Sequence, residues 1–169
     1  YPALADLNDD GRLDLVVGSS DGYLYRYLNI GPQPSTQFVP EGLREPDSFA
    51  EPDKLLLPSG EPFRTAGHTT VAAHDLNGDG LTDLITGSED GSVSMLLGLG
   101  KGEFAAPQPL LAAGVPIRSE AHSAPAAGDL DGDGVPDLVI GEANGQVTLY
   151  KGVAQQPLQF AAAGPLFRA

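Results

Sequence analysis

One acidic pattern occurs three times in this chain, and it limits the folds that the chain can adopt. The three copies read DLNDDGRLDLVVG from residue 6, DLNGDGLTDLITG from residue 75 and DLDGDGVPDLVIG from residue 129. Each copy has oxygen-bearing side chains at positions 1, 3, 5 and 9, and a glycine at position 6. An apolar run with the composition of a buried strand follows directly in each copy. This repetition predicts an array of similar structural units.

Each acidic loop is followed by the signals of a β-hairpin. The hairpin turns are predicted at Asp21-Gly22, Asp90-Gly91 and Asn144-Gly145. Asp, Asn and Gly tolerate the positive φ of a tight turn, so these dipeptides between apolar runs favour a hairpin. The runs after the turns alternate between apolar and polar residues, which indicates strands.

Two further strands complete each predicted unit. Small residues at 70–73 and 124–127 suit an innermost strand that is crowded near a central axis. An outer fourth strand is predicted to open at Phe38, Phe104 and Phe160. Each unit is therefore predicted to be a four-stranded antiparallel sheet, with the acidic loop between its first two strands.

We therefore predict an all-β fold of three β-propeller blades. The approximate repeats are 1–64, 65–118 and 119–169, with a Pro-, Glu- and Asp-containing surface insertion at about 41–61. Closed propellers need roughly four to eight blades. Residues 1–169 are expected to be one segment of a propeller of about six to eight blades. The further blades would come from the same longer chain or from other copies.

The charge of the chain excludes several classes of partner. The formal net charge is −14, and the nine Lys and Arg residues are scattered, so a run of phosphates could not be neutralised. Nucleic acid and anionic membrane surfaces are therefore disfavoured. No apolar stretch approaches the roughly 20 residues that a membrane span needs. Nearly half of the 23 acidic residues lie in the three loops, which indicates metal-binding capacity.

The spacing of the oxygen-bearing residues in each loop is suited to the coordination of a metal ion. Alternate side chains at positions 1, 3 and 5 can turn their oxygens toward one centre, and the glycine at position 6 permits the sharp turn. Several hard oxygen ligands in a flexible loop favour Ca²⁺ over Mg²⁺. An EF-hand would need a bidentate Glu at position 12. That position holds Val17, Thr86 and Ile140, so an EF-hand is excluded.

These motifs resemble the FG-GAP/VCBS repeats of integrin α-subunit propellers and of many bacterial extracellular proteins. The resemblance covers nearly the whole chain outside the insertion, and it implies one blade per repeat and up to three Ca²⁺ ions. The implied ligands, with Arg12, Leu81 and Val135 acting through their backbone carbonyls, are Asp6, Asn8, Asp10, Arg12 and Asp14; Asp75, Asn77, Asp79, Leu81 and Asp83; and Asp129, Asp131, Asp133, Val135 and Asp137. The first copy departs from the others, because Asp9 replaces the glycine at position 4.

A second repeat defines a candidate ligand face. Arg64 is followed four residues later by His68, and Arg118 is followed in the same way by His122. In a propeller these segments would lie beside the Asx-Gly turns, away from the acidic loops. They predict either a recurring polar pocket for a sugar or an acidic partner, or hydrogen bonds between blades. The tyrosines at 23, 25 and 27 similarly predict either a sugar-stacking platform or packing between blades.

The function predicted from the sequence is a Ca²⁺-stabilised interaction or adhesion scaffold. Lectin-like carbohydrate binding and an accessory propeller of a larger enzyme or complex stay open as alternatives, because a fold does not choose among them. No catalytic arrangement stands apart from the metal loops, so the chain is predicted not to be an enzyme. The predicted location is extracellular, cell-surface or periplasmic, and the protein or glycan partner is not identified.

Overall fold

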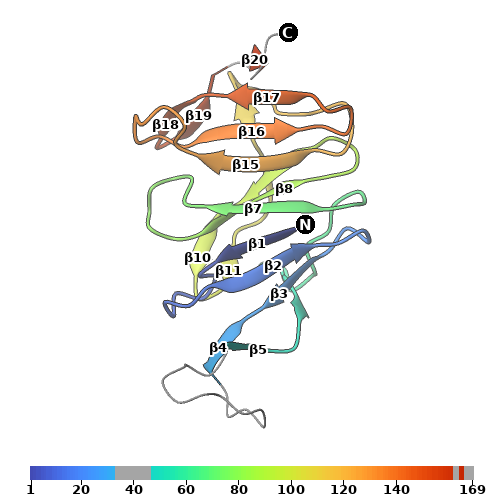
Figure 1. The fold of residues 1–169 in the computed structure, drawn as a ribbon, viewed down its shortest axis with the longest axis vertical. Coiled ribbons are helices and arrows are strands. Elements are labelled where there is room, and N and C mark those ends of the chain that lie inside the picture. Colours follow the sequence, from blue (N-terminus) through green and yellow to red (C-terminus); the bar gives the residue numbers. More distant parts are fainter. Residues whose placement is uncertain (33–46, 162–163, 166–169) are drawn as a thin grey trace, which may run out of the picture.

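The described part of the chain comprises residues 1–32, 47–161 and 164–165 of a computed structural model, and it contains β-strands and turns without a helix. Its three principal sheets are four-stranded and antiparallel (Figure 1). The first sheet contains β1 (Pro2–Ala5), β2 (Asp14–Gly18), β3 (Leu24–Tyr27) and β6 (Asp53–Lys54). The second contains β7 (Thr70–His74), β8 (Asp83–Gly87), β9 (Val93–Leu96) and β12 (Gln108–Pro109). The third contains β15 (Ala124–Gly128), β16 (Asp137–Gly141), β17 (Val147–Tyr150) and β20 (Gly164–Pro165). The predicted all-β fold of antiparallel blades is confirmed.

A short hairpin follows the third strand of each sheet. The three hairpins are β4 (Asn29–Pro32) with β5 (Asp47–Phe49), β10 (Gly98–Gly100) with β11 (Glu103–Phe104), and β18 (Gly152–Gln155) with β19 (Leu158–Phe160). Two further strands, β13 (Leu111–Ala112) and β14 (Val115–Pro116), pair with each other, and β13 also pairs in parallel with β19. The hairpin of the third unit is thereby joined to the segment that leaves the second sheet, and β14, β13, β19 and β18 form a further four-stranded sheet. Within the described ranges there is no helix that could span a membrane.

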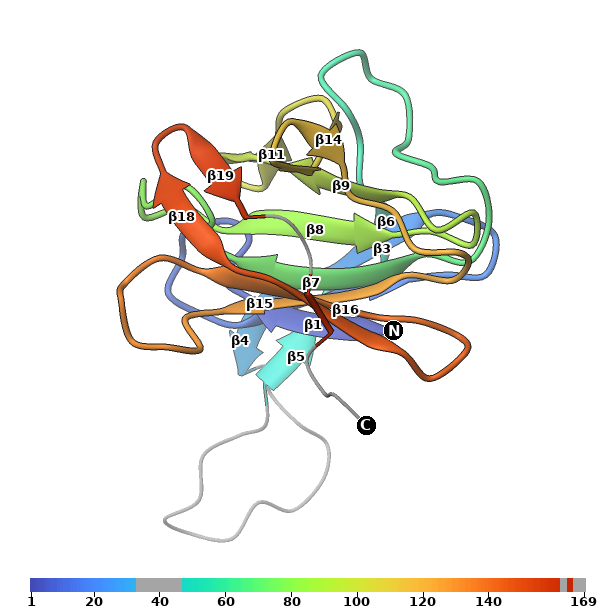
Figure 2. The ribbon, with the colours of Figure 1, turned by 90° about the horizontal axis from the view of Figure 1, so that it is seen from above.

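The acidic loops and the Asx-Gly turns lie at opposite ends of the sheets (Figure 2). Each acidic loop joins the first and second strands, and the ladder places the position-9 aspartates opposite Ala5, His74 and Gly128. The first strands β1, β7 and β15 lie side by side at the inner edges of the sheets (Figure 1). The three sheets therefore meet along their inner strands, as blades do.

The last glycine of each acidic copy lets neighbouring units approach. A Cβ atom on Gly18 would lie 2.1 Å from the Thr69 carbonyl oxygen, and one on Gly87 would lie 2.1 Å from that of Ser123. Both distances are far below van der Waals contact, so any larger residue would force the inner strands apart. Gly141 has no neighbour closer than 3.7 Å, because no described unit follows the third.

Two hydrophobic clusters fill the spaces between the sheets. The cluster between the first and second units contains Leu7, Val16, Leu24, Leu55, Phe63, Val71, Leu84, Leu96 and Phe104. The cluster between the second and third contains Leu76, Ile85, Val93, Leu110, Ala112, Ile117, Leu138, Ile140, Tyr150 and Phe160. Leu84 and Ile85 are neighbours in β8 and belong to different clusters, since successive side chains of a strand point to opposite faces. The middle sheet is consequently covered on both faces.

The structure corrects the predicted start of the fourth strand in all three units. The fourth strands are β6, β12 and β20, which start after the hairpin phenylalanines rather than at them. Phe49 is the residue of the first unit that pairs as Phe104 and Phe160 do, whereas Phe38 lies outside the described residues. The sequence alone favours Phe38, because it is the first phenylalanine after the third strand and the predicted insertion at 41–61 follows it.

The predicted insertion at 41–61 also differs from the structure over its described part. Residues 47–61 contribute β5, β6 and a bridge between Leu56 and Pro62, and Leu55 is fully buried. These elements match β11, β12 and the β13–β14 pair of the second unit. The additional residues of the first unit therefore fall between β4 and β5, in a stretch that is outside the described residues.

We predict that Leu84→Ala lowers the free energy of unfolding by about 2–5 kcal/mol, because it removes a fully buried side chain from the cluster between the first two units. Leu99→Ala is the matched control, since Leu99 is 56% exposed, and it should change stability by less than about 0.5 kcal/mol. Urea unfolding followed by circular dichroism measures both. Equal effects of the two substitutions would contradict the assigned core.

Candidate metal centres

The carboxylate at position 1 organises each acidic loop. In the second loop, Asp75 accepts hydrogen bonds from the backbone N–H groups of Gly78 at 2.8 Å, Asp79 at 3.2 Å and Gly80 at 2.9 Å. Asp129 accepts the equivalent three bonds in the third loop, and Asp6 accepts two in the first. These N–H groups are the largest cause of the lowered pKa of Asp129, which keeps this carboxylate charged.

The side chains at positions 3 and 5 bend back over the loop. In the second loop the Asn77 Oδ1 atom accepts the Asp79 N–H at 2.9 Å, and the Asp79 Oδ1 atom accepts the Leu81 N–H at 2.8 Å. The first and third loops repeat both bonds. Carboxylate and amide oxygens keep further lone pairs beyond these bonds, so they stay available to a cation.

The third loop gathers three carboxylates most closely. One carboxylate oxygen from each of Asp129, Asp131 and Asp137 lies within 4.8 Å of the others. Two oxygens that each lie about 2.4 Å from one Ca²⁺ ion can be separated by at most about 4.8 Å. The spacing of these three side chains therefore fits coordination of a single ion.

The aspartate at position 9 differs from the other oxygen-bearing residues of the loops because it is buried. Asp14 and Asp83 have no exposed surface, and Asp137 is 3% exposed. In the second loop, Asp83 accepts the Leu76 N–H at 2.9 Å and the Gly98 N–H at 2.8 Å, so it ties the loop to the hairpin that follows β9. Burial raises the pKa of Asp83, and these two bonds oppose the rise.

The same two bonds recur in the other units. Asp14 accepts the N–H groups of Leu7 and Asn29, and Asp137 accepts those of Leu130 and Gly152. The sequence indicated a metal ligand at this position but not a second partner in the hairpin. In all three units the residue that donates this hairpin N–H lies 15 residues after the aspartate, and this constant separation is the sequence feature that could have indicated the second partner.

Position 4 adopts a left-handed backbone in all three loops. Gly78 and Gly132 have φ values of 74° and 79°, and Asp9 has a φ of 63°. A non-glycine residue in this region costs of order 1 kcal/mol or more. The Asp9 carboxylate accepts the Lys101 N–H at 2.8 Å, and this bond links the first loop to the hairpin of the second unit. Asp9 therefore joins two units, which Gly cannot do.

Two of the acidic loops are paired with a basic side chain. The Arg12 guanidinium lies 2.5 Å from the Asp10 carboxylate, and the Lys151 ammonium pairs with Asp131 and with Asp133. The Lys151 ammonium is the largest cause of the lowered pKa of Asp131. The sequence analysis did not identify Lys151. The equivalent positions in the first two units hold Leu28 and Leu97, so a charged residue occurs at this position only in the third unit. The second loop has no such cation among the described contacts.

The predicted Arg and His residues lie at the other end of the sheets. Arg64 forms a bridge with Tyr23, and its Nε atom donates to the Asp21 carbonyl oxygen at 3.2 Å. Arg118 forms the equivalent bridge with Ser92. The arginines therefore border the Asx-Gly turns, and the bond from Arg64 to Asp21 lies within the first repeat, so it does not decide between the two sequence interpretations.

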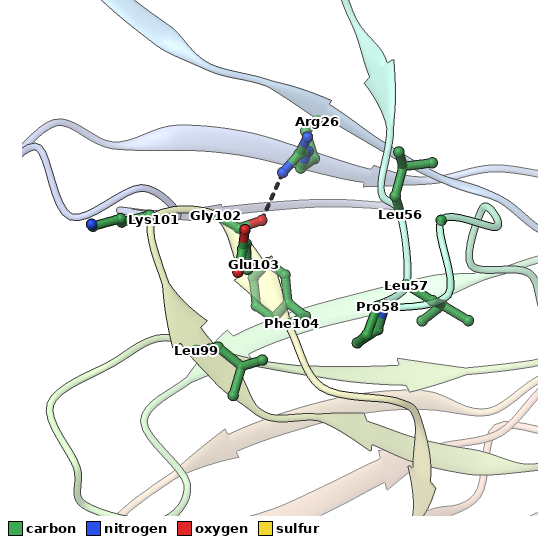
Figure 3. Close-up of a pocket in the computed structure, with 10 residues that line it drawn as sticks. Arg26, Leu56, Leu57, Pro58, Leu99, Lys101, Gly102, Glu103 and Phe104 are labelled. Atoms are coloured by element: carbon green, nitrogen blue, oxygen red, sulfur yellow. Dashed lines mark hydrogen bonds between the residues drawn. The ribbon is translucent and has the colours of Figure 1, made fainter.

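A groove separates the outer parts of the first two units (Figure 3). Its volume is about 570 Å³, and it is lined by Arg26, Leu56, Leu57, Pro58, Gly60, Leu99, Lys101, Gly102, Glu103 and Phe104. Arg26 crosses it and donates to the Gly102 carbonyl oxygen at 2.7 Å.

The corresponding groove between the second and third units has a smaller volume, about 330 Å³. There the Ala113 N–H donates to the Phe160 carbonyl oxygen at 3.0 Å. Pro58 occupies the place of Ala113 in the first unit, and proline has no N–H to make this bond. The first groove therefore lacks the hydrogen bond that links the two sides of the second groove.

Antiparallel four-stranded units that each carry an acidic loop define a β-propeller repeat. Residues 75–140 match the family model of the FG-GAP-like repeat. Human integrin alpha-7 is 31% identical over 162 residues, and human integrin alpha-IIb is 30% identical over 171 residues. Each alignment covers 88% of this chain. The chain belongs to the FG-GAP repeat family, as the sequence motifs predicted.

The alignments cover only a small part of these relatives. The chain spans 12% of human integrin alpha-7 and 15% of human integrin alpha-IIb. Among solved structures, a lectin of Agrocybe aegerita that recognises non-reducing terminal N-acetylglucosamine matches with a TM-score of 0.53. It is 21% identical, and the match covers 98% of this chain and 38% of the lectin. That likeness concerns the fold.

We predict that Lys151→Leu tightens Ca²⁺ binding at the third loop by about three- to tenfold, because an ammonium at the carboxylates repels the ion. A ¹⁵N-resolved NMR titration can follow the Gly134 amide for the third loop and the Gly80 amide for the second. Only the Gly134 midpoint should move. Lys54→Leu is the control and should move neither, and an unchanged Gly134 midpoint in Lys151→Leu would refute the competition.

Proposed function

We propose that this chain is a Ca²⁺-stabilised β-propeller module that serves as an extracellular interaction or adhesion scaffold. The observation that supports it is the triplicated loop, which has oxygen-bearing side chains at positions 1, 3, 5 and 9 in every copy and which in the third copy brings carboxylate oxygens of Asp129, Asp131 and Asp137 within 4.8 Å of one another. The proposed side-chain ligands are Asp6, Asn8, Asp10 and Asp14; Asp75, Asn77, Asp79 and Asp83; and Asp129, Asp131, Asp133 and Asp137. The backbone carbonyls of Arg12, Leu81 and Val135 complete the proposed sets.

The donor chemistry favours Ca²⁺. All side-chain donors are carboxylate or amide oxygens, which suit a hard cation, and the five ligand residues of each set reach its preferred six to eight oxygens when a carboxylate binds through both oxygens or water is added. Without a cation, the carboxylates of each loop repel one another at short range. An ion would remove this repulsion and would fix the link between the first two strands of a blade. The principal role of the metal is therefore structural stabilisation.

The outward faces of the first and third sheets support a larger propeller. Leu15 and Val17 of β2 are half-buried on the face away from the core, as are Val139 and Leu149 of the third sheet. In the middle sheet the corresponding face is covered by a neighbouring unit. Repeat units of this kind bury their apolar faces by stacking on neighbours. We propose that further blades, from the same chain or from other copies, cover these faces.

The module is proposed to be non-enzymatic and to work outside the cytoplasm, where free Ca²⁺ is abundant. Its integrin relatives support this location. A protein partner is favoured over a glycan, because the Lys54 ammonium lies 3.5 Å from the centroid of the Tyr23 ring and occupies a face that would otherwise stack on a sugar. Binding on a glycan array would instead favour the lectin-like alternative. Co-purification with a catalytic subunit would favour an accessory propeller.

Removal of the metal gives the first test. We predict that excess EDTA lowers the Tm by about 10 °C or more relative to protein in millimolar Ca²⁺, because ions bound only by the folded state stabilise it. Differential scanning calorimetry measures the shift, and elemental analysis gives the number of bound ions. An unchanged Tm together with no metal in the purified protein would refute the assignment.

Two substitutions in the second loop separate the metal role from the structural role. Asp79→Asn should remove most of the Ca²⁺-dependent part of the stability and leave the protein in EDTA nearly unchanged, since Asp79 is exposed. Asp83→Asn should also destabilise the protein in EDTA by about 1–3 kcal/mol. The NH₂ group of the asparagine would face a buried backbone N–H, so that N–H would lose its acceptor. Urea unfolding with and without Ca²⁺ distinguishes these outcomes. Identical behaviour of the two variants in EDTA would contradict the dual role of position 9.

A further inference from the structure

Two histidines from neighbouring units meet at the end of the sheets opposite the acidic loops. His68 lies in the segment that leads into β7, and His122 lies in the segment that leads into β15. Their ring centroids are 5.9 Å apart, and the rings are tilted by 55°. Both side chains are exposed, and they border a cavity of about 260 Å³ together with Tyr1, Thr70, Ser123 and Ala124. A solvent-borne ligand can therefore reach both rings.

The backbone holds His122 in an unusual conformation. Its φ is 49°, in the left-handed region that non-glycine residues seldom adopt. The His122 N–H donates to the Glu89 carbonyl oxygen at 3.0 Å, and the next residue, Ser123, bonds to Ser88 through backbone and side chain. These bonds fix the segment against the turn between β8 and β9. The position of the histidine is thus set by the junction of two units.

Glu89 brings a carboxylate to the same place. Its Oε2 atom lies 3.3 Å from the Nδ1 atom of His68. This distance is long for a hydrogen bond between nitrogen and oxygen. It equals the separation of two ligand atoms on a tetrahedral ion with bonds of about 2.0 Å, which is about 3.3 Å.

The three side chains differ chemically from the acidic loops. Two imidazoles and one carboxylate suit borderline transition-metal ions, whereas Ca²⁺ prefers oxygen donors alone. Two histidines, one carboxylate and a water molecule are a recognised tetrahedral set for Zn²⁺. The net charge of −14 also attracts cations to the molecule.

We propose that His68, His122 and Glu89 bind one Zn²⁺-type ion at the junction of the second and third units. The ion takes one nitrogen from each imidazole and one oxygen from the carboxylate, and the fourth position is left to water. The ligand atoms of the three residues do not all lie within 4.8 Å of one another in the structure, so completing the set requires the exposed His122 ring to rotate toward His68 and Glu89. Such an ion ties the segment before β7, the turn after β8 and the segment before β15 together. The protein then carries two classes of metal site, one at each end of its sheets.

The test uses the untagged protein in saturating Ca²⁺, so that the acidic loops are filled. Co²⁺ serves as the probe, because four-coordinate Co²⁺ has an intense visible absorption, and Zn²⁺ affinity is measured by isothermal titration calorimetry. We expect one equivalent of Co²⁺ to give the tetrahedral spectrum and one equivalent of Zn²⁺ to displace it. His68→Ala, His122→Ala and Glu89→Gln should each weaken Zn²⁺ binding by at least about tenfold, since loss of a direct ligand exceeds the effect of an outer-sphere change.

His74→Ala is the matched control, because His74 is the remaining histidine and lies at the end of β7 beside the second acidic loop. It should bind Co²⁺ and Zn²⁺ as the parent protein does. Circular dichroism and Ca²⁺ titration verify that each variant is folded. The proposal is overturned if the tetrahedral Co²⁺ spectrum is absent, if it survives in both His68→Ala and His122→Ala, or if His74→Ala abolishes it.

Discussion

The buried carboxylate at position 9 of each acidic loop is the interaction on which the blade geometry depends. Asp83 accepts one N–H from its own loop and one from the hairpin beyond β9. A single side chain thus fixes the acidic loop, the second strand and the following hairpin relative to one another. A buried carboxylate is costly unless its oxygens are satisfied. Two backbone bonds and a proposed Ca²⁺ ligation meet this requirement in every unit.

The units are joined by contacts that differ from one junction to the next. Asp9 of the first loop bonds to Lys101 of the second unit, and Gln156 of the third unit bonds to the Asn77 carbonyl of the second loop. The first and second loops therefore each contact the hairpin of the following unit. Chelation of the loops is consequently expected to loosen junctions between blades as well as the blades themselves. The array behaves as a chain of nearest-neighbour interfaces.

Local patterns predicted the repeated elements well. The acidic loops, the Asx-Gly turns and the strands on either side of them lie where the motifs placed them, because each depends on short-range spacing and on glycine at positive φ. The fourth strand was predicted at the wrong residues. Residue type alone does not distinguish Phe49 from Phe38 as the counterpart of Phe104 and Phe160, and only the pairing of Phe49 with Asn29 identifies it. The metal ligands themselves stay predictions.

The sequence by itself determined the all-β class, the three acidic loops and the family, because these follow from residue type at fixed separation. Only the tertiary structure decided which residues meet across units. His68 and Glu89 are separated by a whole hairpin, and His122 belongs to the next repeat. The approach of His122 to the other two residues follows from the packing of the inner strands at Gly87, where any side chain would collide with the Ser123 carbonyl oxygen. Such contacts are set by the approach of whole sheets, which no local pattern specifies.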